Sequence, residues 1–252
     1  MESGRMERES AAVRLNRIPG VVAGFTTRSG GVSQPPYDSF NLAVSSGDEQ
    51  ESVDENRRRL LERTGFGPGR LVIAGQVHGA RVAVVNAPGL VPETDGLVTR
   101  ERGLLLGIVA ADCAAVLVAD RSGMIVGAAH AGWRGTSARI VNKLVSTMRR
   151  SGLAGDALLA YVSPCISQEH FEVGPEVAQE FDDVFVVTNP TTGKAHVDLV
   201  GVLTSQLIEA GLSGDDIQVD GRCTVADPET FFSYRGQDGR TGRMMGFVGL
   251  SN

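Results

Sequence analysis

Three side chains that favour transition-metal binding stand out in a chain with only four histidines: His78, Cys113 and His130. His78 lies in Gly75-Gln76-Val77-His78-Gly79, and His130 begins His130-Ala131-Gly132-Trp133-Arg134-Gly135. Two imidazoles and one thiolate form a donor set that suits zinc. Three protein ligands leave a fourth position for water or substrate, as in catalytic zinc sites. Water held at such a position ionises near neutral pH and becomes a nucleophile.

A predicted β-hairpin brings two of these side chains together. The turn signal Asp120-Arg121-Ser122-Gly123 separates two apolar runs within 104–129. If Asp120 faces Gly123, Cys113 lies directly opposite His130, with their β-carbons about 4.5 to 5.5 Å apart. A longer loop would shift this register. His78 would supply the third ligand from the end of a strand predicted at 71–77.

Two other interpretations of these residues stay open. The spacing matches no local zinc motif such as His-Glu-x-x-His, so His78 and His130 could be partly buried, hydrogen-bonded histidines beside a core Cys113. Alternatively, Cys113 could be a nucleophile with His130 as its base, because the predicted pairing suits a cysteine hydrolase equally well. The metal content of the protein distinguishes these interpretations.

Three carboxylates close to these motifs are candidates for supporting roles. Strand alternation points Asp112 away from the face that carries Cys113, so we expect Asp112 to orient a neighbouring ligand. Asp95, in Thr94-Asp95-Gly96, and Glu172 are further acid/base candidates. Sequence spacing alone does not select among them.

Two segments carry groups that suit an anionic ligand. The turn 132–135 leads into a predicted helix, so its backbone N–H groups together with Arg134 could hold an anion such as phosphate. The loop 28–48 is rich in Gly, Ser and Pro, yet it contains Arg28 and Asn41, and we predict that it forms part of the site.

A third segment combines aromatic rings with cations. Phe231-Phe232-Ser233-Tyr234-Arg235 is followed by Arg240 and Arg243. Aromatic faces and guanidinium groups together can stack against a base and grip an anion. Packing of the two phenylalanines in the core is the alternative.

Composition limits the possible partners and location. The 252 residues carry a net charge of −6 with interspersed charges, which argues against nucleic-acid or membrane partners that need a basic surface. The stretch 1–17 is charged and lacks the apolar core of a signal peptide, and no later apolar run approaches the roughly 18 residues that span a bilayer. We therefore expect a cytoplasmic protein, with its three cysteines reduced.

The pattern of elements predicts one catalytic domain at 16–252 after a flexible tail at 1–15. A charged helix is expected at 51–63 and an amphipathic helix at 199–211. Another helix should follow the turn 132–135, capped by Thr136 or Ser137. Strands are expected at 71–77, 81–86, 104–111, 114–119, 124–129, 158–162, 184–187, 217–219 and 246–248. Hairpins interspersed with helices indicate an α+β fold with a mixed sheet.

Together, these segments resemble the YfiH family, bacterial proteins also called laccase-like polyphenol oxidases and now regarded as purine nucleoside phosphorylases. The resemblance runs from about Gly24 to Val248 and rests on the order of its motifs. These motifs include Thr27-Arg28-Ser29-Gly30-Gly31-Val32-Ser33, Asn41-Leu42, Gln76-Val77-His78-Gly79, Thr94-Asp95-Gly96, Ala111-Asp112-Cys113, His130-Ala131-Gly132-Trp133-Arg134-Gly135, Phe171-Glu172-Val173-Gly174 and Phe231-Phe232-Ser233-Tyr234-Arg235.

The resemblance implies a four-layer α/β/β/α sandwich and a catalytic zinc held by His78, Cys113 and His130. It also implies phosphorolysis of adenosine, inosine, guanosine and methylthioadenosine, and hydrolytic deamination of adenosine. The expected partners are therefore purine nucleosides and phosphate, and we expect a monomer. The residues that we assign to substrate binding are Arg28, Asn41, Gln76, Arg134 and Arg235.

The chain departs from the family pattern at Gly236, where a second arginine usually follows Ser233-Tyr234-Arg235. The family's older label, multicopper oxidase, requires more ligands than four histidines supply, although copper could replace zinc in a single site. The fold also resembles that of glutamine-deamidating toxins, and a role in correcting peptidoglycan precursors has been proposed for family members. This resemblance keeps the cysteine hydrolase as the alternative, with Cys113 as nucleophile and His130 as base.

Overall fold

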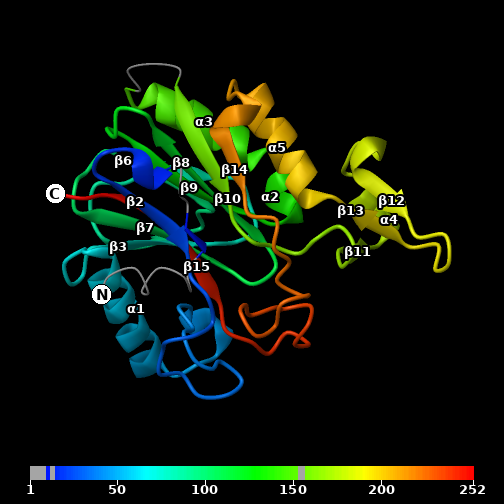
Figure 1. The fold of residues 1–252 in the computed structure, drawn as a ribbon, viewed down its shortest axis with the longest axis horizontal. Coiled ribbons are helices and arrows are strands. Elements are labelled where there is room, and N and C mark those ends of the chain that lie inside the picture. Colours follow the sequence, from blue (N-terminus) through cyan, green and yellow to red (C-terminus); the bar gives the residue numbers. More distant parts are fainter. Residues whose placement is uncertain (1–9, 12–14, 153–156) are drawn as a thin grey trace.

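The computed structural model describes residues 10–11, 15–152 and 157–252 (Figure 1). The tail predicted at 1–15 lies mostly outside these residues. Ser10–Ala11 form a short strand, β1, against β2, and the 3-10 helix η1 (Leu15–Arg17) begins with a fully buried leucine. Among the described residues, no helix is long and apolar enough to cross a bilayer.

Two six-stranded mixed sheets form the centre of the molecule. In the first sheet, β3 runs parallel to both β5 and β7, and the other neighbours are antiparallel. Its strands, in spatial order, are β1 (Ser10–Ala11), β2 (Val21–Phe25), β15 (Met244–Leu250), β7 (Leu104–Ala110), β3 (Leu71–Gly75) and β5 (Gly89–Pro92).

In the second sheet, the two pairs at the edges, β10 with β14 and β4 with β6, are parallel, and the central neighbours are antiparallel. Its strands, in spatial order, are β14 (Ile217–Val219), β10 (Leu158–Val162), β8 (Ala114–Asp120), β9 (Val126–Ala131), β6 (Gly96–Thr99) and β4 (Val82–Val84). The predicted α+β class with mixed sheets is thus confirmed.

A third, small sheet was predicted only in part, by the strand expected at 184–187, which overlaps β12. It projects at the right of Figure 1 with the short helix α4. Its strands are only two or three residues long, too short for a periodic pattern to show in the sequence. The elements of this region are β11 (Glu172–Val173), α4 (Pro175–Ala178), η3 (Asp183–Phe185), β12 (Val186–Thr188) and β13 (Ala195–Val197).

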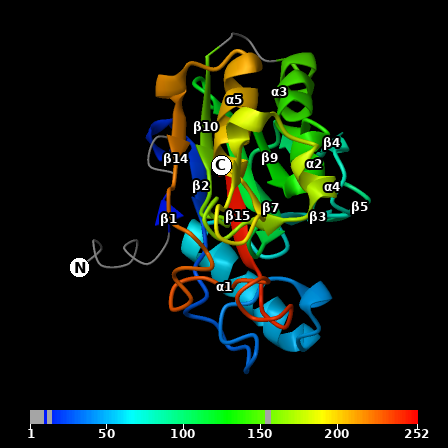
Figure 2. The ribbon, with the colours of Figure 1, turned by 90° about the vertical axis from the view of Figure 1, so that its right-hand side faces the viewer.

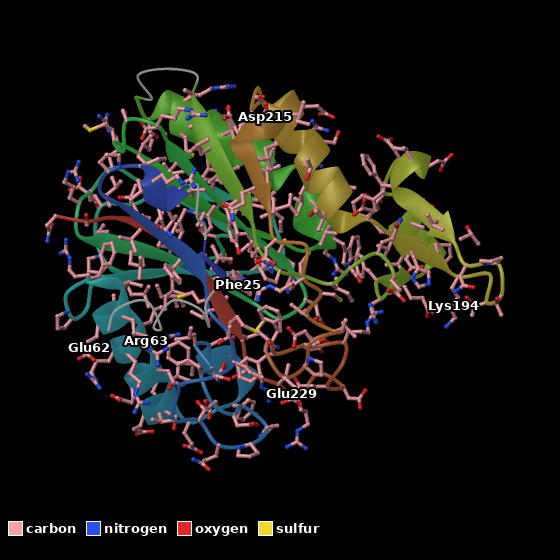
Figure 3. All side chains as sticks on the ribbon, viewed as in Figure 1. Phe25, Glu62, Arg63, Lys194, Asp215 and Glu229 are labelled. Atoms are coloured by element: carbon pink, nitrogen blue, oxygen red, sulfur yellow. The ribbon has the colours of Figure 1, made fainter. Side chains whose placement is uncertain are left out.

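Three apolar clusters hold the elements together. The two large sheets face each other across a core that contains Leu106, Leu117 and Phe25, the last of which is labelled in Figure 3. Helix α1 (Gln50–Thr64) packs Leu60 and other apolar residues on the far side of the first sheet. Helices α3 (Ile140–Arg150) and α5 (Leu199–Glu209) pack on the far side of the second sheet (Figures 1 and 2). The remaining short helices are η2 (Val44–Ser46), α2 (Trp133–Ser137) and η4 (Gly214–Asp216).

The predicted helices form, with one correction at an end. Val141, Leu144 and Met148 of α3 are fully buried, as their helical spacing predicts. The predicted capping of this helix by Thr136 or Ser137 is wrong, because both residues belong to the separate helix α2. The two helices are divided at Arg139, whose φ of 60° lies in the left-handed region.

The predicted β8–β9 hairpin exists, but its register differs from the prediction. The turn is closed by the bond from Gly123 N to Asp120 O, at 3.0 Å, yet two further residues follow before the ladder begins at Ala119 and Val126. The Asp120 carboxylate stabilises this wider loop by accepting the backbone N–H groups of residues 124 and 125 at 2.7 and 2.8 Å. His130 therefore faces Ala115. The shift is two residues, so every side chain keeps its predicted face.

Candidate metal centre

His78, Cys113 and His130 converge as the sequence predicts. One donor atom of each residue lies within 4.8 Å of the other two. The two imidazole rings meet edge to face, with 4.8 Å between their centroids. His130 is buried, Cys113 is half-buried and His78 is exposed, so the cluster opens to solvent on the side of His78.

Strand ends position the three donors. His130 is the next-to-last residue of strand β9 in the second sheet, and Cys113 directly precedes the neighbouring strand β8. His78 follows β3 of the first sheet in a turn where its own φ is 58°. The centre therefore joins the two sheets at one end of the core.

Asp95 holds both histidines in place, His130 through its ring and His78 through the backbone on either side of it. Its Oδ1 lies 2.9 Å from Nδ1 of His130, and its Oδ2 accepts backbone N–H groups of Gly79 at 2.8 Å and Val77 at 3.2 Å. Burial alone would raise the pKa of this carboxyl, but the hydrogen bonds from His130 and the two backbone groups outweigh it and lower the pKa. A carboxylate bonded to the second nitrogen of a histidine is typical of metal sites. The sequence suggested Asp95 only as an acid/base candidate.

The electrostatics of the metal-free protein favour the thiolate. Burial raises the pKa of Cys113, but the charge of His130 and hydrogen bonds from His130 and His78 lower it to about 6. Burial lowers the pKa of His130, whereas the Cys113 thiolate and the Asp95 carboxylate raise it to about 9. The sulfur is therefore held in the form that both a metal ligand and a nucleophile require.

Gly132 leaves the space that an ion between these donors would need. A β-carbon at this position would lie 2.8 Å from Sγ of Cys113 and 3.3 Å from Nδ1 of His78. The backbone at Gly132 has φ −78° and ψ 173°, so glycine is required by this space and not by the conformation. Its absence of a side chain, together with the His-Cys-His donor set, fits a metal ion.

Replacing Gly132 by alanine should weaken metal binding without unfolding the protein. The added methyl group must displace the Cys113 sulfur, since real β-carbons essentially never come within 3.0 Å of another atom. We expect zinc affinity to fall by about 10- to 100-fold, the range seen when the support of a ligand is disturbed. Competition with a chromophoric chelator measures this, and unchanged affinity would show that the ion does not need Gly132.

A cavity of about 450 Å³ opens over the cluster. A cavity of this size suits a small-molecule ligand. Of the five residues predicted to bind substrate, Gln76 and Arg235 line it. Its described lining also includes Trp133, Ile166, Phe171, Tyr234 and Arg243.

The other three predicted binding residues lie outside this cavity. Arg28 donates to the backbone oxygens of Pro228 at 2.7 Å and Asp38 at 3.1 Å, and lines a separate polar pocket. Asn41 is fully buried, and its side chain accepts the N–H of Arg243 at 2.8 Å. Arg134 is exposed and lies over the Trp133 ring, 4.1 Å from its centroid. The positions of these three residues therefore do not support contact with a ligand in the cavity.

The carboxylates of Asp112 and Glu172 bond to groups other than the three candidate metal donors. Asp112 has a φ of 83°, and its carboxylate accepts hydrogen bonds from the segment 224–235 and from neither histidine. The prediction that Asp112 orients a metal ligand through its side chain is therefore wrong. Glu172 is half-buried and pairs with Lys194 at 2.6 Å.

Arg243 lines the cavity, although the sequence indicated it only as a cation that follows the aromatic segment 231–235. It is half-buried, and Nη1 donates to the backbone oxygens of Thr241 at 2.7 Å and Gly242 at 2.9 Å. Burial lowers the pKa of its guanidinium. Among the described residues, no carboxylate forms an ion pair with Arg243. A cation in this setting favours an anionic ligand.

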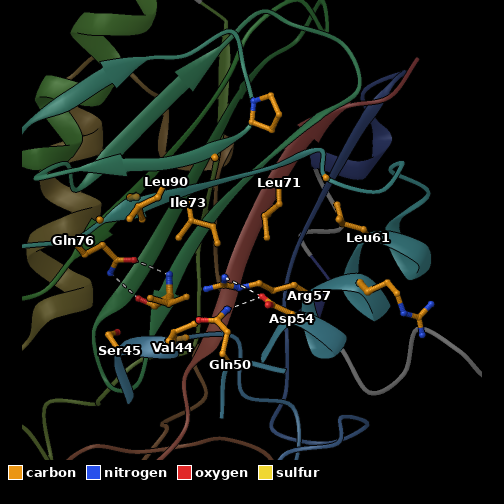
Figure 4. Close-up of a pocket in the computed structure, with 18 of the residues that line it drawn as sticks. Val44, Ser45, Gln50, Asp54, Arg57, Leu61, Leu71, Ile73, Gln76 and Leu90 are labelled. Atoms are coloured by element: carbon orange, nitrogen blue, oxygen red, sulfur yellow. Dashed lines mark hydrogen bonds and ion pairs between the residues drawn. The ribbon is translucent and has the colours of Figure 1, made fainter. Parts of the chain in front are cut away.

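A larger groove of about 890 Å³ adjoins the cavity, with Ser45, Gln76 and Val109 lining both. Figure 4 shows this groove between α1 and strands β3 and β5. The Gln76 amide is fixed at its end by two bonds to the Val109 backbone, at 2.8 and 2.9 Å. The groove contains none of the three metal donors, so we place the chemistry in the smaller cavity.

Comparison with known proteins identifies the family. A family model described as multi-copper polyphenol oxidoreductase laccase matches residues 22–251. The crystal structure of YfiH from Bacillus licheniformis superposes with a TM-score of 0.90 at 30% identity, covering 97% of this chain and 98% of that one. The chain belongs to the YfiH family. YlmD from Geobacillus stearothermophilus, another solved structure of the family, gives a TM-score of 0.88 at 34% identity over 93% of each chain.

Curated relatives in the YfiH family carry an enzyme name. The purine nucleoside phosphorylase of Deinococcus radiodurans is 42% identical over 94% of this chain and 92% of the relative. Purine nucleoside phosphorylase YfiH of Escherichia coli is 37% identical over 92% of this chain and 94% of the relative. Both relatives match over nearly their full length.

Proposed function

We propose that this protein is a purine nucleoside phosphorylase whose chemistry takes place in the cavity over His78, Cys113 and His130. The observation that carries the proposal is the meeting, in one cavity, of a three-donor centre with two arginines, Arg235 and Arg243. The names of the curated relatives support the reaction. In phosphorolysis, a phosphate oxygen bonds to C1′ of the ribose while the bond from C1′ to the purine nitrogen breaks. The purine leaves with the electron pair and takes up a proton.

The donor set suggests zinc as the metal that His78, Cys113 and His130 hold. Zinc in such a site would act as a Lewis acid and supply an ionisable water, the group that hydrolytic deamination of adenosine also needs. Asp95 keeps Nδ1 of His130 occupied at 2.9 Å, which directs the other ring nitrogen toward the cluster. Adenosine deamination at the same centre is part of this proposal.

The other cavity residues provide for the two substrates. Arg235 and Arg243 provide guanidinium groups that can bind phosphate, which a planar fork of donors suits well. Trp133, Phe171 and Tyr234 bring aromatic faces to the same cavity, against which a purine can stack. Adenosine, inosine, guanosine and methylthioadenosine share this purine, and we propose them as substrates.

The test is turnover by zinc-loaded protein. We expect hypoxanthine to be released from inosine in phosphate buffer, with ribose 1-phosphate as the second product, and no release when phosphate is omitted. Adenosine should give adenine with phosphate and inosine by deamination. The proposal would be refuted if protein with one zinc per chain released base from none of the four nucleosides.

A cysteine hydrolase remains a second candidate because of one further observation. The carboxylate of Asp95 bonds to His130, and hydrogen bonds connect His130 and His78 to Cys113, which gives the order acid, histidine and thiolate of a cysteine nucleophile site. Amide substrates, including peptidoglycan precursors, would suit such a site. Turnover of an amide that survives metal removal by a chelator and is abolished by alkylation of Cys113 would favour this candidate. Turnover that a chelator abolishes and zinc restores would exclude it.

A further inference from the structure

Two buried polar side chains hold the backbones of the two cavity arginines. Oδ2 of Asp112 accepts the N–H of Arg235 at 2.6 Å, and Oδ1 of Asn41 accepts the N–H of Arg243 at 2.8 Å. Asn41 is fully buried and Asp112 is 8% exposed. Asn41 lies outside the cavity lining and Asp112 belongs to it, and each holds its arginine through a hydrogen bond to the backbone N–H.

Asp112 is itself held in an unusual conformation. Its φ of 83° lies in the left-handed region, which is uncommon for residues other than glycine, although asparagine and aspartate adopt it more often than most. Its Oδ1 accepts the hydroxyl groups of Thr224 and Ser233, each at 2.7 Å. Ser233 Oγ in turn accepts the N–H of Gly236 at 2.9 Å. The carboxylate therefore connects the turn between β7 and β8, which contains Cys113, to the turn that contains Arg235.

Two backbone carbonyl groups hold the Arg235 guanidinium and leave some of its N–H donors available. Nη1 donates to the backbone oxygen of His170 at 3.2 Å, and Nη2 donates to that of Glu172 at 3.1 Å. A guanidinium has five N–H donors. The two carbonyl groups fix its plane and leave donors for a ligand in the cavity, provided that the backbone of Arg235 stays in place.

We propose that Asp112 is a positioning residue for the phosphate subsite, which it sets by fixing Arg235 relative to the metal ligand Cys113. This proposal rests on the proposed function, because it takes phosphate as the ligand of Arg235 and Arg243. Asp112 directly precedes Cys113 in the chain. A residue next to a metal ligand therefore also positions the side chain that binds the anion. Its role requires a hydrogen-bond acceptor and not a negative charge.

The test measures the dissociation constant of inorganic phosphate for the zinc-loaded full chain by calorimetry, which needs no turnover. Asp112→Gly removes the carboxylate at a φ that glycine adopts without steric cost. We expect it to weaken phosphate binding about tenfold, as the loss of one hydrogen bond that holds a ligand-binding side chain would. Asp112→Asn should bind phosphate nearly as the wild type does, because asparagine tolerates this φ and its amide oxygen can accept the Arg235 N–H.

A double-mutant cycle with Arg235→Gln separates positioning from general damage. In the Arg235→Gln background, Asp112→Gly should change phosphate binding no further, since the side chain that it positions is gone. An equal loss in both backgrounds, or unchanged binding in Asp112→Gly, would overturn the proposal. If Asp112→Gly does not fold, Ser233→Ala replaces it in the cycle, with the same two outcomes deciding.

The same measurement keeps the two proposals apart. Wild-type protein that binds phosphate but releases no base from nucleosides would refute the proposed function and leave the positioning role intact. Wild-type protein that turns over nucleosides while Asp112→Gly binds phosphate normally would refute the positioning role alone. The zinc content of every variant is measured, and a loss of zinc in Asp112→Gly equal to the loss of phosphate binding would also overturn the proposal.

Discussion

Replacing Cys113 by alanine is expected to remove the bound metal and the phosphorolytic activity together. Cys113 provides the only sulfur among the three donors, and the electrostatics of the metal-free protein already hold it as a thiolate with a pKa of about 6. Even residues that merely support a ligand are worth about 10- to 100-fold in metal affinity, so loss of the ligand itself should exceed that range. Metal analysis after dialysis and an inosine phosphorolysis assay measure the two losses.

The matched control is Cys223→Ala, which removes a free thiol outside the donor cluster. Cys223 contacts His170 at 3.6 Å and lines no part of the cavity over the metal donors. Its variant should keep both metal and activity. If Cys113→Ala instead retained one metal per chain and lost only turnover, the sulfur would be a nucleophile and not a ligand.

The central elements and the donor cluster could be predicted because their signals are local. The helical spacing of Val141, Leu144 and Met148 predicts α3, and the two apolar runs around the turn at Asp120 predict the β8–β9 hairpin. The hairpin register was wrong by two residues, because a single side chain, that of Asp120, stabilises a longer loop. A shift of two preserves the faces of a strand, which is why the predicted pairing of Cys113 with His130 remained useful.

The supporting residues could not be predicted because their partners are remote in the sequence. Asp95 contacts a ring 35 positions later, and Asp112 contacts an N–H group 123 positions later. No periodicity or spacing rule joins such pairs, since the fold of both sheets must be known first.

The sequence also could not show which arginines line the cavity. Arg28, Arg134 and Arg243 all look alike as cations in glycine-rich segments, and only the fold shows that Arg243 lines the cavity while Arg28 and Arg134 do not.

Replacing Arg243 by glutamine should raise the apparent KM for phosphate with little change in that for the nucleoside. A hydrogen bond to a charged group contributes about 1.5 to 3 kcal/mol, so we expect an increase of about 10- to 150-fold. If Arg243 binds phosphate equally in the ground and transition states, kcat stays nearly constant. Arg243→Lys should lie between, because it keeps the charge and loses the planar fork. Steady-state kinetics with each substrate varied separately measure these effects.

Arg121→Gln controls for the loss of one positive charge, because Arg121 is exposed at the far end of β8 and pairs with Asp216. It should leave both KM values unchanged. Equal increases for phosphate and nucleoside in Arg243→Gln would argue against a phosphate role for Arg243.

The stability of Arg243→Gln adds an independent criterion. Burial lowers the pKa of this guanidinium and no described carboxylate pairs with it, so the free protein pays a desolvation cost to keep the charge in the cavity. A residue retained for the fold would lower the Tm when replaced. A residue retained for an anion should leave the Tm of the free protein unchanged or higher, and the variant should lose the rise in Tm that phosphate gives the wild type. Thermal unfolding with and without phosphate therefore shows whether Arg243 serves the ligand or the fold.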